Sequence, residues 1–257
     1  MTTAPRVISN RNNLDHHYHR LATGDIIFGK IPMKAGEEHM LFDLASRGVR
    51  CIPSATAQLT SRSKRYQALT LSPWMLPETT VVYDIHQLLA LCNHYHRKSI
   101  TTVVVKQEGK NGGVGILRYG SIEDVFNQAA SDCLVFPFIL QPFLDNSVDM
   151  RVIILGPYKE AYRRVNPHCF RNNLHCGGTA EPCDLSDPAE QLCREVMARA
   201  DCPYGHLDLL LAPQGKIYLS EINLRGGLRG AKISTPEYRR RVTDIENKLL
   251  EKMMPRL

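Results

Sequence analysis

The sequence predicts an α+β fold in which antiparallel hairpins are backed by helices. Three observations support this fold class. A strand, a helix and a second strand follow one another over residues 24–54, and β-rich pairs joined by tight turns occupy 149–165 and 205–223. Helical patterns lie between and after these pairs. At 257 residues, 43% hydrophobic and 23% charged, the chain has the composition of an ordinary soluble globular protein with a sizeable core.

Residues 1–75 are expected to form a polar arm followed by a small β-α-β unit. Residues 1–23 lack periodicity, and the histidine-rich run at 15–19 favours a partly mobile arm over a metal site. A strand at 24–31, an amphipathic helix at 35–48 and a strand at 49–54 follow, and parallel pairing of the two strands is the expected consequence. One helix is then expected over 56–71, and a proline-punctuated linker leads into a strand that ends at 83.

Two further units are expected at 76–140 and 141–257. The first contains a helix at 85–97, a β-branched strand at 99–107, a glycine-rich loop at 108–115, a helix capped by Ser121 and Asp124, and a strand at 134–143. The second contains the hairpin at 149–165, a helix at 187–200, the hairpin at 205–223 and a C-terminal helix at 236–253.

Charge, hydropathy and cysteine usage narrow the function classes. The net charge of +6 suits an anionic ligand, but it is too small and too evenly spread to indicate nucleic acid. No apolar run approaches a membrane span, and the N-terminus lacks the apolar centre of a signal peptide, so a cytoplasmic protein is expected. The eight cysteines show no C-x-x-C spacing, which favours buried, reduced thiols, Cys133 and Cys193 among them, over a zinc site.

Two carboxylates are predicted to face each other in the second hairpin. If its turn is centred between Gln214 and Gly215, then Asp208 lies opposite Glu221, Leu210 opposite Leu219 and Ala212 opposite Ile217. Asn223 would project from the same face as Glu221. The repulsion of the acids could be relieved by protonation, by a nearby Arg or Lys, or by a cation such as Mg²⁺ or Mn²⁺. A longer turn would instead shift the register and separate them.

Basic residues and glycines surround this acid pair in the chain. Lys106 ends a strand that should be buried, and Gly109, Gly112, Gly113 and Gly115 follow it in a loop whose backbone could approach an anion. In the first hairpin, a turn at 157–158 would place Arg151 opposite Arg164, a like-charge pair suited to a polyanion. The loop at 170–180 carries Arg171, Asn172 and Asn173 before a glycine pair. Together these features indicate a Mg²⁺–nucleotide site.

Over residues 48–235 the chain resembles the ATP-grasp carboxylate–amine ligases. The stretches that carry the resemblance are QPFLDNSVDMR, YRRVNPHCFRNNLHCGGTA and GHLDLLLAPQGKIYLSEINLRGGLRG. It is most similar to the branch of ribosomal-protein glutamate ligase, the lysine-biosynthesis ligases and bacterial glutathione synthetase. The resemblance implies an ATP-grasp fold, in which two α+β subdomains clasp ATP, here preceded by a shortened β-α-β unit.

The resemblance also implies a role for each matching residue. Asp208, Glu221 and Asn223 would hold two Mg²⁺ ions, with Glu221 bridging them, and Lys64 and Lys106 would contact the phosphates of ATP. Gln141, Pro142 and Phe143 would form a hinge beside the adenine, and Asp145 would contact the ribose. Gly112, Gly113 and Gly115 would belong to a lid. Arg151, Arg171 and Asn173 would contact the phosphoryl group and the acyl intermediate.

The implied activity is an ADP-forming ligation of a carboxylate and an amine through an acyl phosphate. The substrates would be small molecules, peptides or proteins, with no nucleic acid or membrane as partner, and a homo-oligomer is compatible with the sequence. A phosphotransferase and a non-catalytic Mg-ATP-binding protein are the alternatives. After Asn223 the chain departs from the family's Ser/Pro-Gly, and Arg225, Arg229 and Lys232 would either hold a substrate carboxylate or form a basic rim.

Overall fold

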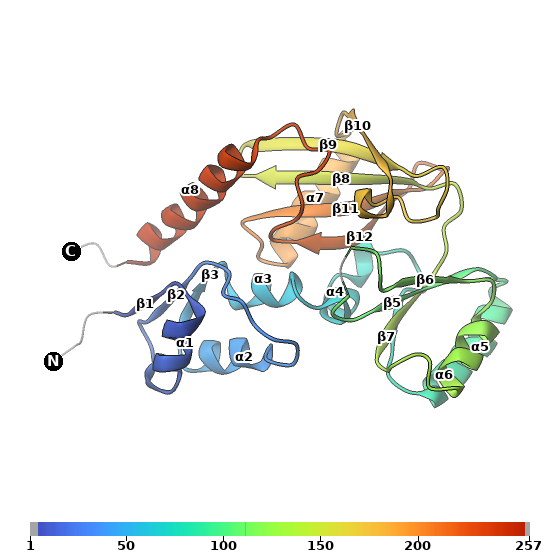
Figure 1. The fold of residues 1–257 in the computed structure, drawn as a ribbon, viewed down its shortest axis with the longest axis horizontal. Coiled ribbons are helices and arrows are strands. Elements are labelled where there is room, and N and C mark those ends of the chain that lie inside the picture. Colours follow the sequence, from blue (N-terminus) through green and yellow to red (C-terminus); the bar gives the residue numbers. More distant parts are fainter. Residues whose placement is uncertain (1–4, 111, 255–257) are drawn as a thin grey trace.

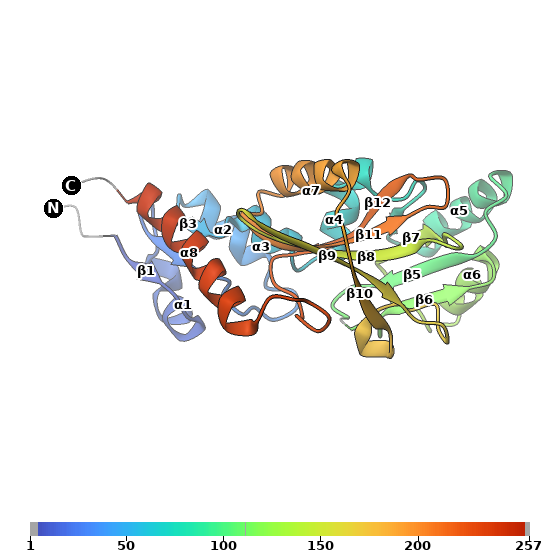
Figure 2. The ribbon, with the colours of Figure 1, turned by 90° about the horizontal axis from the view of Figure 1, so that it is seen from above.

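The computed structural model describes residues 5–110 and 112–254 as three sheets flanked by helices (Figure 1). The N-terminal unit and the four-stranded sheet lie at opposite ends of the molecule, and the five-stranded sheet extends between them (Figure 2). The predicted α+β class is confirmed. Within the described residues, no helix combines the length and the apolar character needed to cross a bilayer.

The N-terminal sheet is larger than the expected β-α-β unit. It contains β1 (Val7–Ile8), β2 (Ile26–Phe28) and β3 (Arg50–Ile52), with α1 (Arg11–His17), the 3₁₀ turn η1 (Tyr18–Arg20) and α2 (His39–Ser46) between them. The strands are parallel in the order β1-β2-β3, which confirms the parallel pairing predicted for 24–54. The mobile arm predicted before Gly24 is wrong, because Leu14 and Leu21 are buried in this unit's core.

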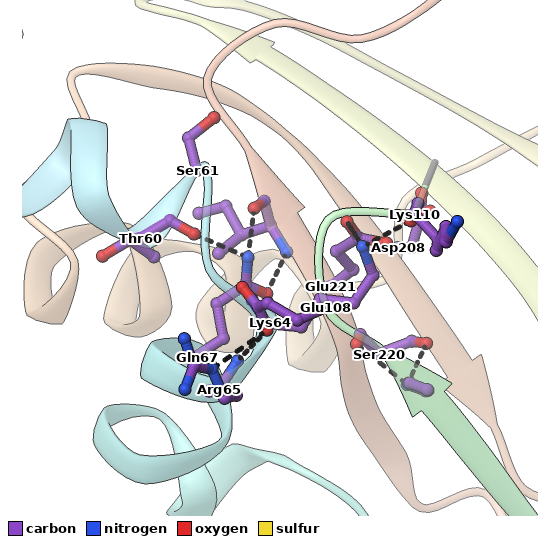
Figure 3. A network of polar contacts seen from close by, with 12 residues as sticks. Thr60, Ser61, Lys64, Arg65, Gln67, Glu108, Lys110, Asp208, Ser220 and Glu221 are labelled. Atoms are coloured by element: carbon purple, nitrogen blue, oxygen red, sulfur yellow. Dashed lines mark hydrogen bonds and ion pairs between the residues drawn. The ribbon is translucent and has the colours of Figure 1, made fainter. Parts of the chain in front are cut away.

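The single helix predicted over 56–71 is also wrong, because the chain breaks it in two. Helices α3 (Ala55–Thr60) and α4 (Lys64–Thr70) are separated by residues 61–63. The Ser63 hydroxyl caps α4 by accepting from the Tyr66 N–H at 3.1 Å. The Glu108 carboxylate accepts from the N–H groups of Lys64 and Arg65 at 3.1 Å each (Figure 3). Because these groups saturate the free donors at the start of α4, the helix begins there.

The four-stranded sheet carries two helices on one face (Figure 1). Its strands are antiparallel in the order β4 (Thr80–Val82), β7 (Phe138–Pro142), β5 (Val103–Gln107) and β6 (Ile116–Tyr119). The short 3₁₀ turn η2 (Ser72–Trp74) precedes it, and α5 (Ile85–Arg97) and α6 (Ile122–Ala130) cover it. The predicted cap of α6 is confirmed, since Ser121 and Asp124 form a reciprocal capping box.

The five-stranded sheet is antiparallel in the order β10-β9-β8-β11-β12. These strands are β10 (Thr179–Cys183), β9 (Tyr158–Val165), β8 (Val148–Leu155), β11 (Tyr204–Leu211) and β12 (Ile217–Asn223), and the 3₁₀ turn η3 (Leu174–Cys176) precedes β10. Helix α7 (Asp187–Arg199) packs on one face (Figure 2), and α8 (Thr235–Met253) runs from the sheet to the N-terminal unit (Figure 1). Both predicted hairpins are confirmed.

The turn of the first hairpin differs from the prediction by one residue. Leu155 pairs with Tyr158, so the turn is Gly156–Pro157, and Arg151 faces Tyr162 while Arg164 faces Asp149. The predicted Arg151–Arg164 pair is therefore wrong. Gly156 has a φ of 62°, and a two-residue hairpin turn requires this left-handed conformation at its first position.

A β-bulge sets the register of the second hairpin. Next to the turn, Leu211 pairs with Ile217 and Leu209 with Leu219, so the predicted Leu210–Leu219 and Ala212–Ile217 pairs are wrong. The bulge between Asp208 and Leu209 leaves Ser220 as the extra residue of β12. Beyond the bulge, Asp208 lies opposite Glu221 as predicted. The extra residue thus compensates for the longer turn and keeps the two acids together.

Free thiols are present at all eight cysteines. Cys51, Cys92, Cys193 and Cys202 are buried, but Cys133, which was expected inside, is exposed at the end of α6. Cys133 follows Asp132, whose φ of 57° turns the chain away from the helix. The sequence does not reveal this turn.

Candidate active site

A cleft of about 1470 Å³ is lined by residues on or next to all three sheets. Thirteen of the fifteen predicted site residues line it: Lys64, Lys106, Gly112, Gly113, Gln141, Phe143, Asp145, Arg151, Arg171, Asn173, Asp208, Glu221 and Asn223. Gly115 and Pro142 do not. A Cβ on Gly115 would lie 2.4 Å from the Lys110 Cβ, so this glycine packs inside its own loop. Pro142 lies between two lining residues, Gln141 and Phe143, and alternation along the strand directs it to the other face.

Two arginines neutralise Asp208, one of the two acids that face each other in the second hairpin. The Arg151 guanidinium donates from Nε and Nη2 to the two carboxylate oxygens of Asp208 at 2.7 and 2.8 Å. Arg164 lies between Asp149 and Asp208, with its Nη2 at 2.5 Å and 3.2 Å from their oxygens. Burial alone would raise the pKa of Asp208, but Arg151 and Arg164 hold it well below its usual range. Burial and the charge of Asp208 raise the pKa of Asp149.

Glu221 and Asn223 have side-chain oxygens available to a ligand. Within the described residues no hydrogen bond reaches either side chain, and the nearest cation to Glu221 is Lys64, 3.6 Å away. Asp208 faces Glu221 across the strands, and Asn223 follows on the same strand. Asp208 Oδ2 faces both arginines, but Oδ1 accepts only from Arg151 and retains a second lone pair. This all-oxygen donor set fits Mg²⁺ or Mn²⁺.

Lys64 and Lys106 line the cleft together with the acids, and Figure 3 shows Lys64 near Glu221. Lys106 Nζ donates to the backbone oxygen and the hydroxyl of Ser220, both at 3.2 Å, so the bulge residue supplies its partners. Burial, partly offset by Glu221 and reinforced by Lys64, lowers the pKa of Lys106 to about 8. Lys64 Nζ donates to the Lys110 carbonyl at 3.0 Å. Both ammonium groups thus lie where an anionic ligand would meet them.

The glycine-rich loop and the 166–178 loop contact each other across the cleft. Arg171 Nε donates to the carbonyls of Gly113 and Ile116 at 3.2 and 3.1 Å. Gly113 has a φ of 81°, and a Cβ there would lie 2.6 Å from Asn173 Nδ2. The predicted catalytic residues Arg171 and Asn173 therefore lie against the predicted lid. Residue 111 of that lid lies outside the described residues.

Phe170 and Arg118, which the sequence did not predict as site residues, stack near Phe143. Phe143 and Phe170 meet edge to face with their ring centroids 6.1 Å apart. The Arg118 guanidinium lies 5.0 Å from the Phe143 ring centroid and 5.5 Å from that of Phe170. Phe170 lies in the 166–178 loop and Arg118 lies in β6, so no local sequence pattern predicts their contact. The arrangement offers planar apolar surface next to Gln141 and Asp145.

Other lining residues were also missed. Asp149 lies opposite Arg164 in the first hairpin, and its carboxylate accepts from Arg164 Nε at 2.6 Å. Lys30 enters the cleft from the N-terminal unit, together with Ser61 and Gln67 from the α3–α4 region. Their sequence positions carry no motif. Of the three basic residues after Asn223, Arg225 and Arg229 line the cleft and Lys232 does not.

The chain is similar to curated proteins that are named as a synthetase and a ligase. The chain is 29% identical over 190 residues to a glutathione synthetase of Parasynechococcus marenigrum, covering 67% of this chain and 58% of that protein. It is 28% identical over 201 residues to a probable alpha-L-glutamate ligase of Cellvibrio japonicus, covering 73% and 64%. The chain thus spans less than two thirds of the length of these curated relatives.

A solved structure has the same fold. The ATP-grasp ligase PsnB complexed with minimal precursor, Mg and ADP aligns with a TM-score of 0.56 at 16% identity, covering 84% of this chain and 66% of that one. The family model described as a RimK-like ATP-grasp domain matches residues 60–253, which contain both larger sheets and all fifteen predicted site residues. The chain belongs to the RimK-like ATP-grasp family.

Proposed function

We propose that this protein is an ATP-dependent ligase that joins a carboxylate to an amine and releases ADP and phosphate. The observation that carries the proposal is the convergence of Asp208, Glu221 and Asn223 with Lys64 and Lys106 in one cleft. Oxygen ligands for a divalent cation next to ammonium groups suit a metal-bound triphosphate. The names of the curated relatives, glutathione synthetase and alpha-L-glutamate ligase, support this reaction class.

The nucleotide would lie between the four-stranded and five-stranded sheets. Lys64 and Lys106 would contact its phosphates, and the loop with Gly112 and Gly113 would cover them, with Gly115 shaping that loop. Gln141 to Phe143 would border the adenine, and Asp145 would bond the ribose. The ADP and Mg in the related PsnB structure support a nucleotide in a cleft of this fold. We further propose three units, at 1–75, 76–140 and 141–257.

Asp208, Glu221 and Asn223 would hold Mg²⁺, as two ions with Glu221 between them, and Mn²⁺ is the alternative metal. Such an ion supplies Lewis-acid stabilisation of negative charge on phosphoryl oxygens. The chain's own contribution begins with Arg151, which orients Asp208 through two hydrogen bonds and adds positive charge beside the ligands. Arg164 neutralises Asp149 in the same layer, so the acids can remain ionised.

The proposed chemistry has two steps. A substrate carboxylate oxygen attacks the γ-phosphorus, and the bond to the β–γ bridging oxygen breaks. ADP departs, and the substrate becomes an acyl phosphate. The amine nitrogen then attacks the acyl carbon, the carbon–oxygen bond to phosphate breaks, and the nitrogen loses a proton to give an amide. Arg151, Arg171 and Asn173 would donate to the transferring phosphoryl group and the tetrahedral oxygen. Closure of the loop by Arg171 would exclude water from the acyl phosphate.

A phosphate-release screen tests this proposal. The full chain with Mg-ATP is incubated with amino acids, peptides and carboxylate–amine pairs, and product masses are read together with ADP and phosphate. A ligase releases phosphate only when both substrates are present. A stable phosphorylated product would indicate a phosphotransferase, and nucleotide binding without release would indicate a non-catalytic protein.

Glu221→Gln is the decisive variant. It keeps the size of the side chain but removes its charge, so we expect turnover to fall at least about 100-fold, as the loss of a charged transition-state contact implies. Glu181→Gln, on the exposed outer strand of the same sheet, is the control and should retain full turnover. Near-normal turnover in Glu221→Gln would overturn the assignment.

A further inference from the structure

We propose that Glu108 is a positioning residue that holds the ammonium group of Lys64 at the predicted phosphate site. Glu108 is not one of the described residues that line the cleft, so it would act through Lys64 rather than on a ligand. The inference rests on the proposed ligase function, because it takes the ligand of Lys64 to be a phosphate group of ATP. It adds a residue from the start of the glycine-rich loop to the residues that shape the site.

The Glu108 carboxylate completes the N-terminus of α4. A helix leaves its first N–H groups without partners inside the helix. The N–H groups of Lys64 and Arg65 donate to Oε1 and Oε2 of Glu108, respectively, at 3.1 Å each. The next N–H, that of Tyr66, donates to the Ser63 hydroxyl at 3.1 Å. The negative charge of Glu108 also suits the positive end of the helix dipole. A residue 44 positions away thus fixes the first turn of the helix that carries Lys64.

The segment that follows Glu108 contacts the same turn of α4 (Figure 3). Lys64 Nζ donates to the Lys110 carbonyl at 3.0 Å, and Arg65 Nε lies 3.6 Å from Glu108 Oε2. Gly109 has a φ of 68°, a left-handed conformation that favours glycine, so the chain can bend between these contacts. Residues 108–110 and the first turn of α4 therefore form one hydrogen-bonded unit.

Lys64 also faces the predicted metal site. Its Nζ lies 3.6 Å from Glu221 Oε1, and only 12% of its side chain is exposed. A lysine loses rotamer freedom when a ligand immobilises it, so contacts that fix it beforehand reduce the cost of binding a phosphate. Glu108 fixes the backbone of Lys64, and the Lys110 carbonyl fixes its Nζ. Together they preorganise this ammonium group for an anion.

The end of β5 supplies the other predicted phosphate contact. Lys106 lies two residues before Glu108 and donates to the backbone oxygen and the hydroxyl of Ser220, both at 3.2 Å. This part of the chain therefore carries one lysine of the site and, through Glu108, determines where the other lysine is held. Loss of the Glu108 contacts should displace Lys64 but leave those of Lys106 in place.

Glu108→Gln tests the proposal, because it keeps the size of the side chain but turns one acceptor oxygen into an NH₂ group that faces a backbone N–H. The affinity of the full chain for a non-hydrolysable ATP analogue with Mg²⁺ is measured by calorimetry. We expect the variant to bind about tenfold more weakly, because the phosphate contact of Lys64 is weakened. In a Lys64→Met background the same change should weaken binding by less than about twofold, because Lys64 transmits the effect.

A conservative variant and a matched control separate positioning from general stability. Glu108→Asp keeps the negative charge at the start of α4 and should lose less affinity than Glu108→Gln. Asp84→Asn is the control, since Asp84 Oδ1 accepts from the Gln87 N–H at 2.8 Å at the start of α5. Asp84 is not among the described residues that line the cleft, so its replacement should leave nucleotide affinity unchanged.

Hydrogen exchange tests the contact itself without nucleotide. In the nucleotide-free protein, the amide protons of Lys64 and Arg65, followed by NMR, should exchange faster in Glu108→Gln than in the natural protein. Unchanged exchange, unchanged affinity, or an equal loss of affinity with and without Lys64 would overturn the proposal. If the natural protein does not bind Mg-nucleotide, the ligase function fails, and the exchange rates still decide whether Glu108 holds the first turn of α4.

Discussion

The side-chain amide of Gln67 pairs with both backbone polar groups of Ile222. Its Nε2 donates to the Ile222 carbonyl at 2.9 Å, and its Oε1 accepts from the Ile222 N–H at 3.0 Å. β12 is the edge strand of its sheet, so Gln67 takes the place of a further strand at that edge. Ile222 lies between Glu221 and Asn223. Helix α4 therefore holds the two predicted metal ligands of β12 in position.

Gln67→Met should loosen this edge and weaken nucleotide binding. The change leaves two buried backbone groups without their partner, so we expect a loss of about 1–3 kcal/mol in the free energy of unfolding. The affinity for Mg-ATP, measured with a fluorescent nucleotide, should fall by about tenfold because the ligands on β12 lose their fixed position.

Gln58→Met is the matched control for that variant. Gln58 is a fully buried glutamine of neighbouring α3 whose Nε2 bonds the Pro53 carbonyl at 3.0 Å, away from β12. Its replacement should lower stability but leave nucleotide affinity unchanged. Gln67→Glu keeps the acceptor for the Ile222 N–H and should show an intermediate loss. Equal nucleotide affinities in Gln67→Met and Gln58→Met would show that the pairing does not position the site.

Nucleotide affinity should depend on pH through Lys106. Since its pKa is lowered to about 8, the side chain is a cation below pH 8 and loses its charge as the pH rises through that value. A bound phosphate favours the cation, so affinity for Mg-ATP should be highest below pH 8 and fall by up to about tenfold per pH unit above it. Binding titrations from pH 7 to pH 9.5 measure this fall.

Lys106→Arg separates the lysine from other titrating groups. An arginine stays charged over the whole range, so its pH-dependent fall should be smaller than that of the natural protein. Lys34→Met should retain the full fall, because Lys34 is exposed and does not line the cleft. An identical pH profile in the natural protein and Lys106→Arg would contradict the role of Lys106.

Leu14→Ala should destabilise the N-terminal unit, although the sequence around Leu14 looks like a polar arm. Leu14 is fully buried among Leu21, Ile27 and Leu44 in the core of this unit. Truncation of a buried leucine costs about 2–5 kcal/mol. Urea unfolding measures the loss, and Phe42→Ala on the exposed face of α2 is the control, since 59% of Phe42 is exposed. Similar stabilities of the two variants would show that residues 5–23 do not pack as described.

Local patterns were sufficient for most of the elements and for the chemical types at the site. Helix α5 follows from its apolar period, α6 from its capping box, and the two hairpins from β-rich runs around tight turns. The rule that opposite residues of a hairpin share a face predicted the acid pair, but the register assumed next to the turn was wrong and the bulge restores the pairing of Asp208 with Glu221. The predictions of helix bounds were wrong where a residue distant in the chain determines where a helix begins. The start of α4, which the Glu108 carboxylate caps, is an example.

The sequence by itself determined the family and the order of acids, amide, lysines and glycines along the chain. The tertiary structure decided how they meet. The bulge at Ser220 restores the opposition of Asp208 and Glu221, and Gln67 pairs with the edge of β12. Lys30 reaches the cleft from another sheet, and nothing in its local sequence predicts this. The physical reason is that hydrogen-bond partners and charges act through space, so residues far apart in the chain complete the site.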